Sequence, residues 1–237
     1  MIDIQNVSKS YGKKQPLKEI ALSIPKGEVF GLLGRNGAGK STLLSILATI
    51  AAPDSGTAYI NGMDSWKKKR KVRQAIGYIP QDIALWEQHT VKENMITFSR
   101  LSGAKASTEQ LKKLCEEVQL EGHWNEKVRK LSGGMKRKLN IAAALIHDPD
   151  VLLMDEPTVG IDLQSKLEIN RLVKTLADRG KTIVYTTHDL NEIMTLFDRI
   201  GVLSSGTFSF IGNAKSAEEE FSDDGSGDEW IYRLLNT

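Results

Sequence analysis

The feature that most constrains this chain is an apolar run followed at once by a glycine-rich loop, VFGLLGRNGAGKST, at residues 29–42. Residues 29–33 are predicted to form a buried strand. A helix is predicted after the loop from the spacing of its apolar residues, Leu43, Leu44, Leu47 and Ile50. A strand, a glycine loop and a helix in that order open an α/β fold. The apolar runs VLLMD, TIVYT and RIGVL predict further strands of a parallel sheet that is buried on both faces.

The loop fits the phosphate-binding pattern G-x-x-x-x-G-K-[ST] without a mismatch. Its glycines let the backbone curl, so that consecutive N–H groups point at the β-phosphate of a nucleotide. Lys40 is predicted to reach the β- and γ-phosphate oxygens, and the Ser41 hydroxyl is predicted to bind Mg²⁺. The residues expected to bind nucleotide here are Gly34, Asn36, Gly37, Ala38, Gly39, Lys40, Ser41 and Thr42.

The segment VLLMDEP supplies the second half of a nucleoside triphosphatase site. It predicts a buried strand with Asp155 at its carboxyl end, where parallel sheets bind their ligands. Because side chains alternate in direction along a strand, Asp155 and the following Glu156 point to different places. We therefore predict that Asp155 binds the metal and that Glu156 is the general base for the attacking water.

A second loop suited to an anion occurs much later in the chain, in KLSGGMKRKLN at residues 130–140. Ser132, Gly133 and Gly134 stand directly before a predicted helix. The free N–H groups and the positive dipole end of such a helix favour an anion. The chain therefore offers two phosphate-binding loops, and one nucleotide does not obviously need both.

With these loops the chain resembles, along nearly its full length, the nucleotide-binding subunits of ATP-binding cassette (ABC) transporters. LSGGM matches the family's signature loop, LSGGQ, except that Met135 replaces the glutamine. This loop is far more specific than a P-loop, which many unrelated ATPases and GTPases share. The phrases LSGGMKRKLNIAAALIHDPDVLLMDEPTVGID and TTHDLNEIMTLFDRI are most similar to the exporter branch often called ABC-2 type, which handles drugs, antibiotics, peptides or polysaccharides.

Four further positions match functional positions of this family, in the family's order. Tyr11 matches the aromatic residue that stacks on adenine, and Gln81 matches the Q-loop glutamine between the core and a helical subdomain. Asp162, in VGID, matches the D-loop, where the family more often has SALD; taken alone it could also be a helix N-cap. His188 matches the switch histidine that contacts the γ-phosphate.

The resemblance implies a head-to-tail dimer, because the family places the signature loop in a separate helical subdomain. The P-loop of one chain would hold ATP while Ser132 and Gly134 of the other close over its γ-phosphate, with Gly133 and Asp162 beside them. The implied cofactors are ATP and Mg²⁺. The implied metal ligands are Ser41, Gln81 and Asp155, and the implied catalytic residues are Glu156, His188, Gln81 and Lys40.

The resemblance also implies one domain over residues 1–237 with an α/β, P-loop ABC ATPase fold. We expect a RecA-like core with a mainly parallel sheet and an N-terminal antiparallel β part at about 1–80 and 145–213. A helical subdomain with the signature loop is expected at about 81–144, and an acidic tail at 214–237. Within the tail, residues 217–229 are expected to be loop or poorly ordered, followed by a short helix in EWIYRLL.

The composition indicates which cellular compartment and which classes of partner are expected. The net charge of +2 gives no broad field for nucleic acid, so no nucleic-acid partner is expected. The single Cys115 excludes a disulfide framework and favours a reducing compartment. The longest apolar runs, such as residues 141–146, are far shorter than the roughly 18 residues of a membrane span. We expect a peripheral subunit on the cytoplasmic face of the cell membrane.

Its expected partners are a second ABC ATPase subunit and an integral membrane permease. The permease would dock near Gln81 and the helical subdomain, where Trp86 in DIALWEQ could contact it or could be a core residue. The main alternative is a soluble ABC ATPase without a transport role, such as the iron–sulfur assembly type. A P-loop GTPase is disfavoured, because the chain lacks an N-K-x-D sequence for guanine and such a protein has no reason to carry LSGG.

Overall fold

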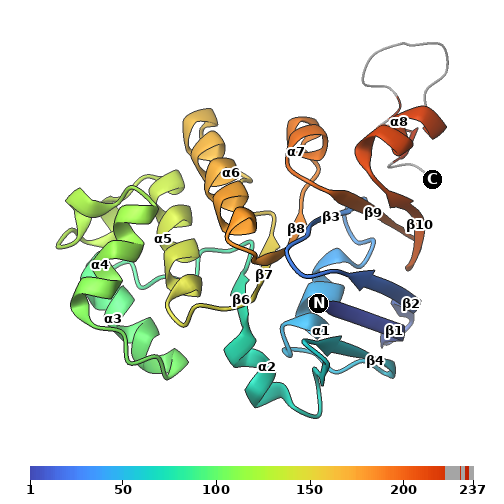
Figure 1. Ribbon diagram of the computed structural model, residues 1–237, viewed down its shortest axis with the longest axis horizontal. Coiled ribbons are helices and arrows are strands. Elements are labelled where there is room, and N and C mark those ends of the chain that lie inside the picture. Colours follow the sequence, from blue (N-terminus) through green and yellow to red (C-terminus); the bar gives the residue numbers. More distant parts are fainter. Residues whose placement is uncertain (222–229, 231–232, 235–237) are drawn as a thin grey trace.

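The computed structural model describes residues 1–221, 230, 233 and 234, and its elements are arranged around two sheets (Figure 1). Within these residues, the first sheet is antiparallel with the strand order β2-β1-β4-β5. Its strands are β1 (Ile2–Tyr11), β2 (Lys14–Ile24), β4 (Ser55–Ile60) and β5 (Met63–Asp64). It forms the expected N-terminal antiparallel part.

The second sheet is the predicted core, with the order β10-β9-β3-β8-β7-β6 among the described residues. Neighbouring strands are parallel, except that β10 pairs antiparallel at one edge. The strands are β3 (Val29–Leu33), β6 (Ile76–Ile79), β7 (Val151–Asp155), β8 (Thr182–Thr186), β9 (Arg199–Ser204) and β10 (Thr207–Gly212). Every residue of β3, β7 and β8 is buried, as their unbroken apolar runs predicted.

Alternate side chains of the core strands enter two separate hydrophobic clusters. Phe30, Leu153 and Val184 pack on one face against α1 (Lys40–Leu47) and the antiparallel sheet. Their neighbours on the other face include Leu152 and Ile183, which pack against α6 (Leu163–Asp178). The core sheet is thus the middle layer of the molecule, which confirms the predicted α/β class.

The predicted helix after the glycine loop is correct for Leu43, Leu44 and Leu47, which are buried. The prediction is wrong for Ile50, which is 60% exposed. The helix ends at Leu47, and Thr49 takes a φ of 60°, which turns the chain away before residue 50. Ile50 therefore no longer follows the helical spacing.

A separate group of helices lies at one end of the molecule (Figure 1). It contains α3 (Val91–Ser102), α4 (Thr108–Glu117) and α5 (Gly133–Leu145), and α3 and α4 each begin with a capping box. Their buried residues form a cluster apart from the sheet clusters. We propose that this group is the helical subdomain expected at about residues 81–144. Cys115 lies in its core, where burial raises the pKa of the thiol to about 12.

The short helix α2 (Lys69–Ala75) leads into β6, and α7 (Leu190–Thr195) lies between β8 and β9. After β10 the chain continues into α8 (Ala214–Phe221). The expectation of loop for residues 217–229 is therefore wrong for 217–221, because Ala217 is buried against β9 and β10. Residues 222–229 lie outside the described part. In EWIYRLL, residues 230, 233 and 234 are helical, and Trp230 and Leu234 join the same cluster.

Among the described helices, none combines the length and the apolar character that crossing a bilayer requires.

Candidate nucleotide site

A cavity of about 510 Å³ lies where four neighbouring strands of the core sheet end. The P-loop follows β3, Gln81 follows β6, Glu156 follows β7 and His188 follows β8. Because these strands are parallel, their carboxyl ends meet at one edge and bring these segments together. The cavity is lined by Pro16, Asn36, Gly37, Gly39, Lys40, Ser41, Thr42, Gln81, Glu156, Val159 and His188.

The P-loop conformation depends on its glycines. Gly34 and Gly39 have φ angles of 141° and 112°, which L-residues with side chains rarely adopt. A Cβ on Gly34 would lie 2.3 Å from the Leu203 carbonyl oxygen, and one on Gly39 would lie 2.3 Å from the Pro16 carbonyl oxygen. Neither position has room for a side chain, so the loop is held close against its neighbours.

Lys40 is buried at the start of α1, with 6% of its surface exposed. Its Nζ donates to the carbonyl oxygen of Gly34 at 2.6 Å and to that of Arg35 at 3.3 Å. Burial lowers the pKa of this amine, while the negative charges of Glu156 and Asp155 raise it. Both acids of VLLMDEP thus lie near enough to act on the charge of the lysine, and its role in binding phosphate stays a prediction.

The two acids at the end of β7 have different surroundings: among the described residues, Glu156 lines the cavity and Asp155 does not. Asp155 is buried and accepts a hydrogen bond of 2.7 Å from the hydroxyl of Thr186. That hydroxyl also accepts a bond of 2.8 Å from the backbone N–H of Glu156, which takes a φ of 45°. Thr186 on β8 therefore fixes both acids, although nothing in the sequence marks it.

Gln81 and His188 approach Glu156 from two sides. The amide of Gln81 donates to Glu156 Oε2 at 3.4 Å, and Nδ1 of His188 lies 3.8 Å from Glu156 Oε1. The four residues predicted to be catalytic, Lys40, Gln81, Glu156 and His188, thus line one cavity. This arrangement suits positioning of an attacking water next to a phosphate.

The residues of this site fit a nucleoside triphosphate with Mg²⁺. The glycine cradle excludes side chains, Lys40 supplies a cation and Ser41 supplies a hydroxyl in the lining of the cavity. Asp155 supplies a buried carboxylate at the end of β7. No cluster of three or more His, Cys, Asp or Glu residues that could hold a metal occurs in the described part of the chain. Mg²⁺ is usually bound by one or two carboxylates together with water and phosphate oxygens, so the single carboxylate of Asp155 would fit such an ion.

A buried arginine that the sequence does not reveal holds the backbone around Gln81. Arg137 of α5 donates from its guanidinium to the carbonyl oxygens of Pro80 at 2.9 Å and Gln81 at 2.6 Å. Burial lowers the pKa of this group. The helix that carries the signature loop is therefore tied directly to the Q-loop.

The signature loop lies outside the cavity. Among the described residues, the lining of the cavity does not include Ser132, Gly133, Gly134 or Asp162. Ser132 is the N-cap of α5, and its hydroxyl accepts from the N–H of Met135 at 3.2 Å. The side chain of Met135 packs against the hydrophobic cluster of the helical group. The second anion loop is thus separate from the cavity that the P-loop lines.

The signature loop is packed tightly on the segment that carries Asp162. Asp162 is the N-cap of α6 and accepts from the N–H and the hydroxyl of Ser165 at 2.9 and 2.8 Å. These bonds lower its pKa. A Cβ on Gly134 would lie 1.9 Å from Ser165 Oγ, so only glycine permits this contact.

Replacing Gly134 with alanine is therefore expected to destabilise the fold, by about 1–3 kcal/mol as for other overpacked sites. Urea denaturation of Gly134→Ala beside the wild type measures the effect. Gly122→Ala is the matched control, because a Cβ there meets nothing within 4 Å. Equal stability of Gly134→Ala and the wild type would contradict the close contact between α5 and α6.

Tyr11 does not line the cavity. It ends β1 with its side chain 53% exposed, and Nζ of Lys9 lies 5.3 Å from the centre of its ring. An exposed ring of this kind is available for stacking. Its predicted contact with adenine stays a prediction.

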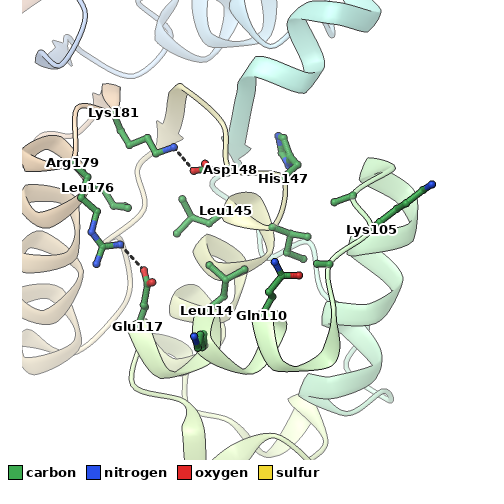
Figure 2. Close-up of a pocket in the computed structure, with 14 residues that line it drawn as sticks. Lys105, Gln110, Leu114, Glu117, Leu145, His147, Asp148, Leu176, Arg179 and Lys181 are labelled. Carbon is green, nitrogen blue, oxygen red and sulfur yellow. Dashed lines mark hydrogen bonds and ion pairs between the residues drawn. The ribbon is translucent and has the colours of Figure 1, made fainter.

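A second cavity of about 530 Å³ lies between α4 and the ends of α5 and α6 (Figure 2). Two ion pairs line it, Arg179 with Glu117 at 2.9 Å and Lys181 with Asp148. Among the described residues, none of those predicted for the nucleotide site lines this cavity. This second cavity therefore lies between the helical group and the helix α6 that covers the core sheet.

Comparison with known proteins identifies the chain. Residues 17–159, more than half of the chain, match the sequence profile of the family described as "ABC transporter". The chain belongs to the ABC transporter family. The ATP-binding protein for linearmycin resistance of Bacillus subtilis (strain 168) is 42% identical over 90% of this chain and 69% of that protein. A Nod factor export ATP-binding protein of Burkholderia orbicola (strain AU 1054) is 44% identical over 86% of this chain and 68% of that protein.

Solved structures of ABC cassettes share this fold. A dimeric bacterial ABC transporter cassette is 31% identical, with a TM-score of 0.80 over 90% of this chain and 98% of that chain. A dimeric cassette in a post-hydrolysis state bound to ADP and Pi is 29% identical, with a TM-score of 0.79 over the same shares. The resemblance and the fold class stated from the sequence are thereby confirmed, and the chain is an ATP-binding ABC ATPase.

Proposed function

We propose that this ABC ATPase is the nucleotide-binding subunit of an exporter and hydrolyses ATP to drive transport through a separate membrane subunit. One observation carries the hydrolytic half of this proposal: Lys40, Gln81, Glu156 and His188 line a single cavity at the ends of four strands. The names of the relatives, which refer to linearmycin resistance and to Nod factor export, favour an exporter over a soluble ABC ATPase.

In this proposal the groups of the cavity divide the work. Lys40 and the P-loop N–H groups hold the phosphates, Glu156 accepts a proton from the attacking water, and His188 contacts the γ-phosphate. Ser41, Asp155 and Gln81 would hold Mg²⁺, which neutralises charge on the phosphates when it is bound. Tyr11 would stack on the adenine.

The position of the signature loop supports a dimer. Ser132, Gly133 and Gly134 lie outside the cavity of their own chain, at the N-terminus of α5. A helix N-terminus binds anions, so we propose that these residues and Asp162 close over the γ-phosphate held by a second subunit. Two-fold symmetry then gives two composite sites per dimer.

The proposed docking surface for the permease surrounds Gln81 and the helical group, on the cytoplasmic face of the membrane. Trp86 is 42% exposed, so its side chain is partly buried and partly open to solvent. Its ring packs on Phe98 at 5.1 Å between ring centres, and its backbone N–H donates to Asn94 at 2.9 Å. The indole is thus held in a fixed position with one part open to a partner.

Replacing Ser132 with arginine tests the dimer model. We expect Ser132→Arg to bind ATP as a monomer with unchanged affinity, because Ser132 lies outside the cavity. Hydrolysis should fall by about 10²-fold or more, since the bulky side chain would block the anion loop from the second subunit. ATP titration and steady-state turnover at several protein concentrations measure the two effects.

The control is Ser107→Arg, which removes the equivalent N-cap from α4. It should lose stability but keep turnover. If Ser132→Arg lost monomer binding and turnover equally, the model in which this loop acts on the second subunit would be wrong.

Co-purification separates transport from the alternative: an exporter subunit should bring down a polytopic membrane protein, whereas an assembly ATPase should bring down soluble scaffold proteins.

A further inference from the structure

A buried acid that the proposed mechanism does not use lies directly behind the site. Glu192 of α7 has 0% of its surface exposed. Its Oε1 accepts from the hydroxyl of Thr158 at 2.8 Å and from the hydroxyl of Tyr185 at 2.9 Å. Its Oε2 accepts from the hydroxyl of Thr187 at 2.5 Å. Three hydroxyl groups thus converge on one carboxylate.

No ion pair in the described part of the chain involves Glu192. A buried carboxylate without a cation is costly unless hydrogen bonds compensate it, and here the compensation comes from neutral hydroxyl groups. Burial and the charge of Glu192 raise the pKa of Tyr185 well above its usual range, so its hydroxyl stays a donor. Because a buried charge adds little to the stability of a fold, the main effect of Glu192 is to fix the geometry of the residues that are hydrogen-bonded to it.

The hydroxyl groups belong to the two segments that carry the catalytic groups. Thr158 follows Glu156 by two residues, in the turn after β7. Thr187 directly precedes His188, at the end of β8. Glu192 therefore joins the turn of the proposed base to the segment of the proposed switch histidine from behind, without lining the cavity itself.

The first turn of α7 holds Glu192 in place. Asp189 caps this helix by accepting from the N–H of Glu192 at 3.2 Å, and the N–H of Asp189 donates to Thr187 Oγ1 at 3.0 Å. Asp189 also forms an ion pair with Lys166 of α6. The carboxylate of Glu192 is thus anchored through its own backbone as well as through its three donors.

We propose that Glu192 is a positioning residue that sets the spacing between Glu156 and His188 through Thr158 and Thr187. The inference rests on the roles proposed for Glu156 and His188. Its role is geometric, so an uncharged side chain of the same shape should largely replace it. Glutamine can accept from Thr158 and Tyr185 through its oxygen, and its amide can donate to the Thr187 oxygen.

The test compares kcat, KM for ATP and melting temperature for Glu192→Ala and Glu192→Gln. We expect Glu192→Ala to lower kcat by about 10- to 100-fold, because small misplacements of reacting groups have effects of this size. KM should stay within about threefold, because Glu192 does not line the nucleotide cavity. Glu192→Gln should recover most of kcat.

Thr182→Val is the matched control, because it removes a buried hydroxyl that accepts from Gly27 at the opposite end of β8. It should lower the melting temperature and leave kcat unchanged. Thr187→Val keeps Glu192 and detaches only the segment of His188, so it tests the proposal even if Glu192→Ala fails to fold. We expect Thr187→Val to lower kcat without changing KM.

Two results would overturn the proposal: full kcat in both folded Glu192→Ala and Thr187→Val, or a kcat in Glu192→Gln as low as in Glu192→Ala. The wild type and Glu156→Gln are measured in the same series. If Glu156→Gln also turns over normally, the base assignment fails as well; if it is inactive, only the inference about Glu192 fails.

Discussion

Replacing Glu156 with glutamine is expected to lower kcat for ATP hydrolysis by about 10²- to 10⁴-fold, the range that general base catalysis contributes. The amide has the shape of the carboxylate but cannot take the proton of the attacking water. The backbone of residue 156 should keep its place, because its N–H is bound by Thr186. Nucleotide affinity should therefore change little.

The same variant is expected to accumulate as an ATP-bound dimer, because the γ-phosphate that joins the subunits is no longer removed. Size-exclusion chromatography with and without ATP measures this, beside a steady-state assay of phosphate release. Glu117→Gln is a suitable control, since that carboxylate pairs with Arg179 in the second cavity. Near-normal turnover by Glu156→Gln would remove this residue from the role of base.

Replacing Lys40 with alanine is expected to weaken ATP binding by about 10- to 150-fold, from the 1.5–3 kcal/mol of a hydrogen bond to a charged group. The loss has two sources. The phosphates lose their cation, and the carbonyl oxygens of Gly34 and Arg35 lose the donor that holds them. The loop should therefore become less ordered before nucleotide arrives.

Titration with a fluorescent ATP analogue measures this affinity without requiring turnover. Lys69→Ala is the control, because Lys69 lies on α2, and among the described residues it does not line the cavity. A wild-type affinity in Lys40→Ala would contradict the assignment of this lysine to the phosphate cradle.

The parts of the site that could be predicted are those set by one continuous segment or by the shared edge of buried parallel strands. The P-loop is one continuous segment, so its sequence pattern is enough to predict its conformation. Glu156 and His188 meet because each follows a buried parallel strand, and the edge where such strands end is common to all of them. The apolar runs VLLMD and TIVYT predicted the two strands, and the resemblance to the family added the assignment of His188.

The parts that could not be predicted are contacts between residues with no characteristic spacing. Thr186, Glu192 and Arg137 stand in ordinary strand or helix sequence, and their roles appear only when their partners are known. The edge strand β10 escaped prediction because buried and exposed residues alternate in it without a long apolar run. The trans role of the signature loop came from the resemblance alone.

The contact between Gly134 and Ser165 has a consequence for how two subunits would come together. Because no side-chain atom fits between the first turns of α5 and α6, these turns cannot slide past each other, and they carry Ser132 and Asp162 respectively. The two residues proposed to contact the second subunit's nucleotide would therefore move together. We expect the interface to form in a single concerted event, with no intermediate in which only one of the two loops is engaged.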